Sequence, residues 1–332
     1  INFLQDDLDS LVNTPSSFTA TTGERGTIKP KANFDAGDDA VALRKAIEGL
    51  GTKDKVLIDI LTHRSSAQRQ LICEAYHEAT DRTLVDDVKG DTSGDFEDVL
   101  VALITPPAAF DCHEVMRAMK GAGTEDSVLI EIFTSRSNQQ IKALTDVYLE
   151  ETEKKLTLDL KSEVSGDFAD ALLLLAEVSP HDAKKRVCVC TLYEAGEKKW
   201  GTDESKFVDI LCQRSIPQLR QTLVEYKNIS GKTLQQSIEG EMSGELEELL
   251  VAIVKCAKSV PAYFAERLYE SMKGGGTDES TLNRIMVSRS EIDMLDIRAE
   301  FKKLYEYSLH SAIERLWRHL HADCCSPSCY NF

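Results

Sequence analysis

Apolar residues along the chain recur at steps of three and four, which is the period of a helix that buries one face. One clear stretch contains Cys112, Val115, Met116 and Met119, then Leu129, Ile132 and Phe133, then Ile141, Leu144 and Tyr148, then Phe168, Leu172 and Leu175. No sustained alternation of apolar and polar residues indicates β-strands. The pattern therefore predicts an all-α protein.

The chain also repeats itself. Four segments share a glycine followed by threonine, and they read Gly49-Leu50-Gly51-Thr52, Gly121-Ala122-Gly123-Thr124, Lys199-Trp200-Gly201-Thr202 and Gly274-Gly275-Gly276-Thr277. The glycines before threonine are 72, 78 and 75 residues apart, and an arginine followed by serine stands 13 residues after each (Arg64, Arg136, Arg214 and Arg289). One supersecondary unit of about five helices is therefore predicted to occur four times.

These spacings divide the chain into an arm at residues 1–33, repeat one at 34–105, repeat two at 106–177, a linker with repeat three at 178–259, and repeat four at 260–332. The arm is rich in Thr, Ser, Gly and Pro, so we expect it to be mobile. The end of repeat four departs from the pattern of the other repeats, because Leu316-Trp317-Arg318-His319 stands where repeat two has Glu163-Val164-Ser165-Gly166.

The glycine–threonine segments admit an ordinary structural interpretation. Glycine commonly ends a helix, threonine is a favoured N-cap, and acidic residues suit the first turn of the next helix. A second feature is not explained by residues that end one helix and begin the next. Forty residues after each marker glycine stand Asp91, Glu163, Glu241 and Leu316, so three of the four loops have a carboxylate at one fixed offset.

Glycine-rich loops with one distant carboxylate suit calcium. Calcium takes six to eight oxygen ligands in flexible geometry and accepts backbone carbonyls as readily as carboxylates. Glycine allows backbone conformations that turn several carbonyls toward one point. Such a site leaves positions for water, where a lipid phosphate can bind the metal.

Charge limits the possible partners. The chain has 39 Lys and Arg against 56 Asp and Glu, a formal net charge of −17, which opposes direct attraction to nucleic acid or to an anionic membrane. A divalent cation could bridge two negative surfaces. We expect no membrane span and no secretory leader, because no apolar run is long enough and the first residues are acidic. Nine cysteines, several in apolar helical runs, favour reduced thiols in the cytoplasm.

At these residues the sequence resembles the annexin family, whose repeat contains Met-Lys-Gly-x-Gly-Thr, a later Arg-Ser and an acid about forty positions on. Met119-Lys120-Gly121-Ala122-Gly123-Thr124 and Met272-Lys273-Gly274-Gly275-Gly276-Thr277 match this motif directly, and the resemblance extends from Gly23 to Glu314. It implies four five-helix repeats in a curved disc that binds phosphatidylserine-like membranes through Ca²⁺. It also implies roles in membrane organisation, exocytosis or phospholipase A2 inhibition, and a possible protein partner for the arm.

The resemblance further implies a ligand set for each repeat. The expected ligands are Ile47, Gly49, Gly51 and Asp91 in repeat one, Met119, Gly121, Gly123 and Glu163 in repeat two, and Gly196, Lys199, Gly201 and Glu241 in repeat three, whose loop is longer. Repeat four keeps Met272, Gly274 and Gly276, but Leu316 cannot bind a metal, so this site should be weak or empty. Trp200 is expected at a loop tip, either in contact with the membrane or folded back onto its own repeat.

Two other functions remain open from the sequence. A helical protein-binding solenoid would use the same loops only as helix ends, and its binding would not depend on calcium. A lipid-cleaving or inositol-phosphate-cleaving enzyme would need a nucleophile or a base cluster, and no Gly-x-Ser-x-Gly, His-Glu-x-x-His or phosphate-loop motif is present. We therefore expect a binding protein and not an enzyme.

Overall fold

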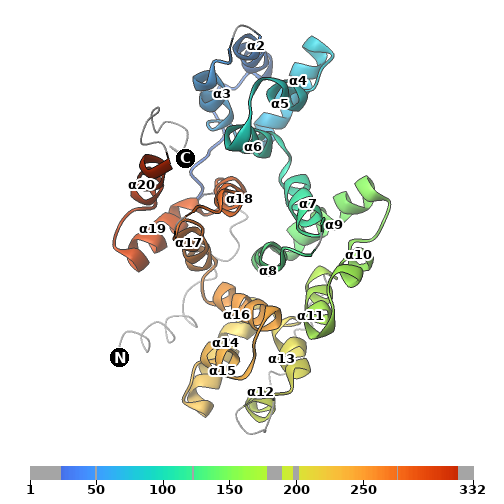
Figure 1. The fold of residues 1–332 in the computed structure, drawn as a ribbon, viewed down its shortest axis with the longest axis vertical. Coiled ribbons are helices and arrows are strands. Elements are labelled where there is room, and N and C mark those ends of the chain that lie inside the picture. The colour runs from blue at the N-terminus through green and yellow to red at the C-terminus, as the bar shows by residue number, and fades with distance from the viewer. Residues whose placement is uncertain are drawn as a thin grey trace. The chain divides into compact units, whose positions relative to one another are not determined.

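The computed structural model describes residues 24–48, 51–121, 123–177, 189–196, 202–274 and 276–320, with side chains up to residue 316. These residues form helices connected by short loops, as the apolar period predicts (Figure 1). Within the described part of the chain, no helix is long and apolar enough to cross a bilayer.

The first two repeats contain five helices each. Those of repeat one are α2 (Ala36–Ile47), α3 (Asp54–Leu61), α4 (Ser66–Thr80), α5 (Leu84–Asp91) and α6 (Gly94–Ile104). Those of repeat two are α7 (Pro107–Ala118), α8 (Asp126–Ser135), α9 (Asn138–Thr152), α10 (Leu156–Glu163) and α11 (Gly166–Ala176). The helix order and lengths of the two repeats correspond closely.

Repeat three has the same order, and repeat four has four described helices. Those of repeat three are α12 (Val189–Ala195), α13 (Glu204–Leu211), α14 (Ile216–Ser230), α15 (Leu234–Glu241) and α16 (Glu245–Lys258). Those of repeat four are α17 (Val260–Ser271), α18 (Glu279–Arg289), α19 (Met294–Tyr305) and α20 (Leu309–Leu320). By packing, the described chain forms two compact units, residues 111–263 and residues 24–110 with 264–320.

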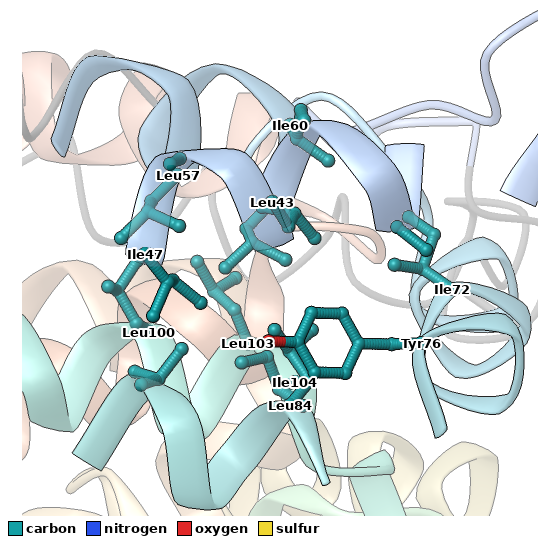
Figure 2. Packing of buried hydrophobic residues seen from close by; sticks show 14 of the residues in the cluster. Leu43, Ile47, Leu57, Ile60, Ile72, Tyr76, Leu84, Leu100, Leu103 and Ile104 are labelled. Atoms are coloured by element: carbon teal, nitrogen blue, oxygen red, sulfur yellow. The ribbon is translucent and has the colours of Figure 1, made fainter. Parts of the chain in front are cut away.

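The core of repeat one shows how a repeat is held together. Leu43 of α2, Leu57 of α3, Ile72 of α4 and Leu103 of α6 are fully buried and belong to one apolar cluster that also contains Tyr76 (Figure 2). Fully burying an aliphatic side chain of this size contributes about 1.5–3 kcal/mol, so this apolar cluster supplies much of the favourable free energy of the repeat. The core positions follow the steps of three and four in the sequence.

In repeats one and two, the arginine of the Arg-Ser motif joins the first helix to the start of the third, whereas Arg289 of repeat four pairs with Asp293 at 2.7 Å. Arg64 donates two hydrogen bonds to the carboxylate of Asp39, at 2.6 and 2.8 Å, and Arg136 does the same to Asp111, at 2.8 and 2.7 Å. All four of these residues are buried. Two parallel bonds to one carboxylate fix the relative orientation of the two segments as well as neutralising both charges.

The serine of the same motif begins the next helix. The Ser65 hydroxyl accepts the backbone N–H of Gln68, and the Gln68 side chain accepts the N–H of Ser65 in return. Ser137 and Gln140 form the same reciprocal cap at the start of α9. This arrangement satisfies N–H groups that lie too close to the helix start for an intrahelical partner.

The last part of the expected arm is fixed to repeat four. Ser290 accepts backbone hydrogen bonds from Thr27 and Ile28, at 2.7 and 3.1 Å, and Leu295 donates one to the carbonyl of Arg25, at 2.9 Å. The Arg25 side chain also pairs with Asp296 at 2.8 Å. Mobility of this stretch is therefore the wrong expectation, while residues 1–23 lie outside the described residues.

The buried pair in repeat two leads to a stability prediction. Replacing Arg136 with Ala should lower the free energy of unfolding by about 3–5 kcal/mol, because Asp111 would remain as a buried, unpaired charge. Urea denaturation followed by circular dichroism measures the change. The control is Lys142→Ala, which removes an exposed pair with Asp146 and should change stability by less than about 1 kcal/mol. Equal effects of the two substitutions would contradict a structural role for the buried pair.

Candidate metal centres in the repeat loops

The four glycine–threonine loops connect the first two helices of each repeat and are closed in the same way. A backbone N–H after each threonine donates to a carbonyl at or near the end of the preceding helix: Lys53 to Ala46 (2.9 Å), Glu125 to Ala118 (2.8 Å), Asp203 to Ala195 (3.0 Å) and Asp278 to Ser271 (2.8 Å). The bond in repeat three encloses one more residue than the others. The third loop is therefore longer, as the sequence predicts.

Glycine is required by the backbone conformation of these loops. Gly51, Gly121, Gly123 and Gly274 have φ values of +87°, +130°, +119° and +115°, which other residues adopt only under strain. No atom lies within 4 Å of a Cβ built on any of the four, so these glycines are not explained by crowding. The space beside these four glycines is therefore open, and it leaves room for a cation that is bound by backbone carbonyls.

Threonine links each of the first three loops to the carboxylate-bearing residue 39 positions later. The Thr52 hydroxyl donates to the backbone carbonyl of Asp91 at 2.9 Å, and the Thr124 hydroxyl donates to that of Glu163 at 3.5 Å. In repeat three the Thr202 hydroxyl donates to the Glu241 carboxylate itself, at 3.3 Å. The fixed offset in the sequence therefore corresponds to direct contact in space.

This contact overturns the expectation that the threonines are helix N-caps. The N-cap residues of α3, α8, α13 and α18 are Lys53, Glu125, Asp203 and Asp278, one position later in each repeat. The hydroxyls of Thr52, Thr124 and Thr202 are directed to another helix end instead. Capping of the next helix consequently does not account for the threonines in these three repeats.

The three carboxylates occupy an electrostatically unfavourable place. Asp91, Glu163 and Glu241 are the last residues of α5, α10 and α15, and all three are exposed. A helix C-terminus carries partial negative charge from its free carbonyls, so it favours a cation and disfavours a carboxylate. Exposed acid at the same helix end in three repeats is what a cation site would need.

Further negative charge lies beside the second loop. Asp126 begins α8, and its partial burial, followed by the nearby Glu245 and Glu248, raises the pKa of its carboxyl group. One of its carboxylate oxygens is buried and has no hydrogen-bond partner among the described residues. These groups add to the negative potential around the loop and favour cation binding there.

The donors suit calcium better than a metal that needs several side-chain ligands. Among the described residues, no group of three or more His, Cys, Asp or Glu is placed to hold a metal. A metal at these loops would therefore take most of its oxygens from backbone carbonyls and water, with one carboxylate. Calcium accepts that combination, whereas zinc prefers nitrogen and sulfur ligands.

The predicted ligands are described to different extents in the four repeats. Repeat two is described at all four predicted residues, and repeat one is described at Ile47, Gly51 and Asp91. In repeat three only Gly196 and Glu241 are described, and the φ of Gly196 is not positive. Gly49, Lys199, Trp200 and Gly201 lie outside the described residues.

Repeat four differs in both loop and acid. Gly274 has a positive φ like its counterpart Gly121, but Gly276 does not share the positive φ of Gly123. Leu316 lies within α20, which continues to Leu320, whereas the corresponding helices of the other repeats end at the acid. The fourth loop therefore faces no carboxylate at the forty-residue offset.

Comparison with known proteins gives one family. The family model described as Annexin matches residues 38–103, 110–175, 189–253 and 263–316. Annexin A3 of Mus musculus is 56% identical over 300 residues, covering 88% of this chain and 92% of that protein. Among solved structures, one described as annexin III has a TM-score of 0.86 and 53% identity, covering 88% of this chain and 93% of that chain. Another, described as calcium-bound annexin (Sm)1, has a TM-score of 0.77 and 36% identity, covering 88% and 89%.

The loop backbone leads to a prediction that needs no metal. Replacing Gly123 with Ala should lower the free energy of unfolding by about 1–3 kcal/mol, because a φ of +119° strains a residue that carries a Cβ. The matched control is Gly240→Ala inside α15, which should raise stability by about 0.5–1 kcal/mol. Both are measured by urea denaturation in the presence of a chelator. If both substitutions stabilised the protein, the loop would not have the described backbone.

Proposed function

The chain belongs to the annexin family, and from this premise we propose that it binds acidic phospholipid membranes through calcium ions held in its repeat loops. Annexins are known for calcium-dependent phospholipid binding. The observation that carries the proposal is the threonine contact, which joins each of three loops to the acidic residue at a helix end, through its backbone carbonyl in repeats one and two and through its carboxylate in repeat three.

Repeat two supports the proposal most fully. The carbonyls of Met119, Gly121 and Gly123 and the carboxylate of Glu163 are the groups that would hold calcium there. Calcium takes six to eight oxygens, so this protein set leaves positions for water or for a lipid phosphate. When bound, the ion supplies the positive charge that joins an acidic protein to an acidic surface.

Net charge explains why a cation is needed. A chain with a formal charge of −17 is repelled by an anionic bilayer in the absence of a bridging ion. Calcium shared between a loop and a lipid phosphate removes this repulsion locally and leaves the contact reversible. Binding would therefore rise and fall with the concentration of free calcium.

Several finer proposals rest on the same mechanism. We infer a cytoplasmic protein that becomes peripheral on membranes when calcium rises, with effects on membrane organisation, exocytosis or access of phospholipase A2 to its substrate. Trp200 would enter the membrane interface beside the third loop, because its ring is apolar with one polar edge. The N-terminal residues would be available to a protein partner.

Vesicle binding tests the proposal directly. Co-sedimentation with phosphatidylserine vesicles should require calcium and should reverse when a chelator is added, because the bridging charge is then lost. Emission of Trp200, followed in a Trp317→Phe background, should change only when vesicles and calcium are both present. Equal sedimentation in calcium and in chelator would instead favour a protein-binding solenoid whose loops hold no metal.

Unequal contributions of the repeats are also expected. Glu163→Gln or Glu241→Gln should raise the calcium concentration for half-maximal vesicle binding by about tenfold at the affected site, equivalent to about 1.4 kcal/mol. A bulky residue at Gly276 should change the titration little, because the fourth loop faces no carboxylate. The control is Glu239→Gln on the same helix as Glu241, which should have no effect. A shift with Glu239→Gln as large as that with Glu241→Gln would show that general surface charge governs binding.

A further inference from the structure

The fourth helix of each repeat occupies the same place in all four repeats. Its first residue, 33 positions after the glycine before threonine, is a buried leucine in every repeat, and the residue four positions later is also buried and apolar. These residues are Leu84 and Val88, Leu156 and Leu160, Leu234 and Ile238, and Leu309 and Ile313. As far as Ile313, α20 therefore lies in its repeat as α5, α10 and α15 lie in theirs.

The end of this helix differs in repeat four. α5, α10 and α15 end at the acid of the forty-residue offset, whereas α20 passes the equivalent Leu316 and continues to Leu320. Four further residues lengthen a helix by about 6 Å, because each residue adds about 1.5 Å. α20 therefore extends by about one helical turn beyond the level at which the other three repeats have their acids.

The chain does not turn back where the other repeats do. In repeats one to three, the fifth helix begins at a serine–glycine pair 42 and 43 positions after the glycine before threonine, and Gly94, Gly166 and Gly244 of these pairs have positive φ values. The fifth helix then packs against the fourth. The same two positions in repeat four are Arg318 and His319, and both lie within α20. The described residues of repeat four thus include no fifth helix to cover the end of α20.

α20 is amphipathic along its whole length. Leu316 and Leu320 follow the buried Leu309 and Ile313 at steps of three and four, so these positions share one face of the helix. Trp317, four positions after Ile313, stands at one edge of that face. The first half of the apolar face is buried in the repeat, and its second half continues beyond the level at which the other fourth helices end.

The charge at the end of α20 is the reverse of that in the other repeats. The fourth helices of repeats one to three end in Asp or Glu, whereas the last two turns of α20 contain Arg315, Arg318 and His319 and a single acid, Glu314. Cations in the last turn are favourable beside the partial negative charge of a helix C-terminus. In a chain with a net charge of −17, this helix end is therefore suited to an anionic surface without a bridging metal ion.

The proposed function places lipid at this level of a repeat. Asp91, Glu163 and Glu241, at the ends of their fourth helices, would bind calcium ions that are shared with lipid phosphates. Because α20 lies in its repeat as those helices do, the residues after Leu316 extend past that level in the direction of the lipid. This continuity with the proposed membrane surface favours a bilayer over a soluble protein as the partner of the apolar face.

We propose that the end of α20, from Leu316 to Leu320, inserts into the interface of an anionic bilayer and gives repeat four a membrane contact that uses no metal. The proposal rests on the proposed function, because calcium in the other loops first brings the acidic protein to the membrane. Trp and Leu favour the membrane interface when they share a helix face, and Arg318 on the polar side would contact lipid phosphates. One helical turn is too small to hold the protein alone, so removal of calcium still releases it.

Fluorescence of Trp317 tests the insertion. Trp200→Phe leaves Trp317 as the single tryptophan, since the chain contains two. The vesicles contain phosphatidylserine and a phosphatidylcholine that carries bromine on its acyl chains, and calcium is raised until all of the protein sediments. The Trp317 emission should then shift to shorter wavelength and be quenched by the bromine, and a chelator should reverse both changes. An unshifted and unquenched emission from sedimented protein would overturn the proposal.

A double variant measures the contribution of the apolar face. In saturating calcium, Trp317→Ser with Leu320→Ser should raise the lipid concentration for half-maximal binding by about threefold to tenfold. The matched control is Leu304→Ser, because Leu304 is exposed at the end of α19 and precedes the start of α20, at the opposite end from Leu320. The control should bind like the wild type, and circular dichroism checks that both variants are folded. A double variant with the lipid requirement of the wild type would contradict the insertion.

Three further outcomes separate other coverings of this face and the possible failures. A Trp317 emission that shifts with protein concentration in the absence of vesicles would assign the face to a second copy of the chain and overturn the proposal. A Trp317 that acrylamide does not quench in the free protein would show that the chain itself covers the face, with the same consequence. Wild-type protein that fails to sediment with vesicles in calcium would overturn the proposed function as well, whereas sedimentation with Trp317 still in water would overturn the α20 proposal alone.

Discussion

The hydrogen bond from a loop threonine to the helix end 39 residues later is the interaction on which the account depends. It joins the connection between the first two helices of a repeat to the end of the fourth. An ion held at this point would therefore contact parts of the chain that are distant in sequence. In repeats one and two the buried Arg–Asp pair and the capped serine hold the intervening helices, and the threonine of the loop meets the backbone carbonyl of the acidic residue in both.

This arrangement has an electrostatic consequence. A carboxylate at a helix C-terminus adds negative charge to an end that is already negative, and each such placement disfavours the folded state by a fraction of a kcal/mol to about 1 kcal/mol. The chain does this three times while carrying a net charge of −17. A bound calcium ion would attract both the carboxylate and the negative helix end, and so would offset the repulsion between them. Repeat four, which has Leu316 and a continuing helix at this place, has no such grouping.

Much of the fold can be predicted from the sequence. The apolar period identifies the helices, and the repeated glycine–threonine segments give their grouping, because both features are local or periodic. The offset of Asp91, Glu163 and Glu241 also indicates which groups meet. The role of the threonines could not be predicted, because a hydroxyl before a helix is equally suited to capping that helix. Only the three-dimensional structure shows that Thr52 is directed to Asp91.

A cavity of about 680 Å³ beside the second loop, lined by Met116, Tyr148 and Lys154 among others, is also beyond prediction from the sequence, because it depends on side chains from several helices that leave space unfilled. The sequence does contain a difference between repeats two and four that can be interpreted once the positions of the helices are known. Counted from the glycine before threonine, Tyr269, Tyr305 and Tyr307 of repeat four stand where repeat two has Met116, Thr152 and Lys154, and the rings of Tyr269 and Tyr305 are stacked. Repeats with the same order of helices therefore differ in how their side chains fill the space between the helices.

The central claim is that calcium is held jointly by a loop and by the acid that its threonine contacts. A crystal structure of the protein grown with saturating calcium tests this claim most directly. The account predicts an ion in repeat two within about 2.3–2.6 Å of the carbonyls of Met119, Gly121 and Gly123 and of the Glu163 carboxylate, and a weaker or absent ion in repeat four. A second loop without an ion, or an ion bound away from Glu163, would contradict it.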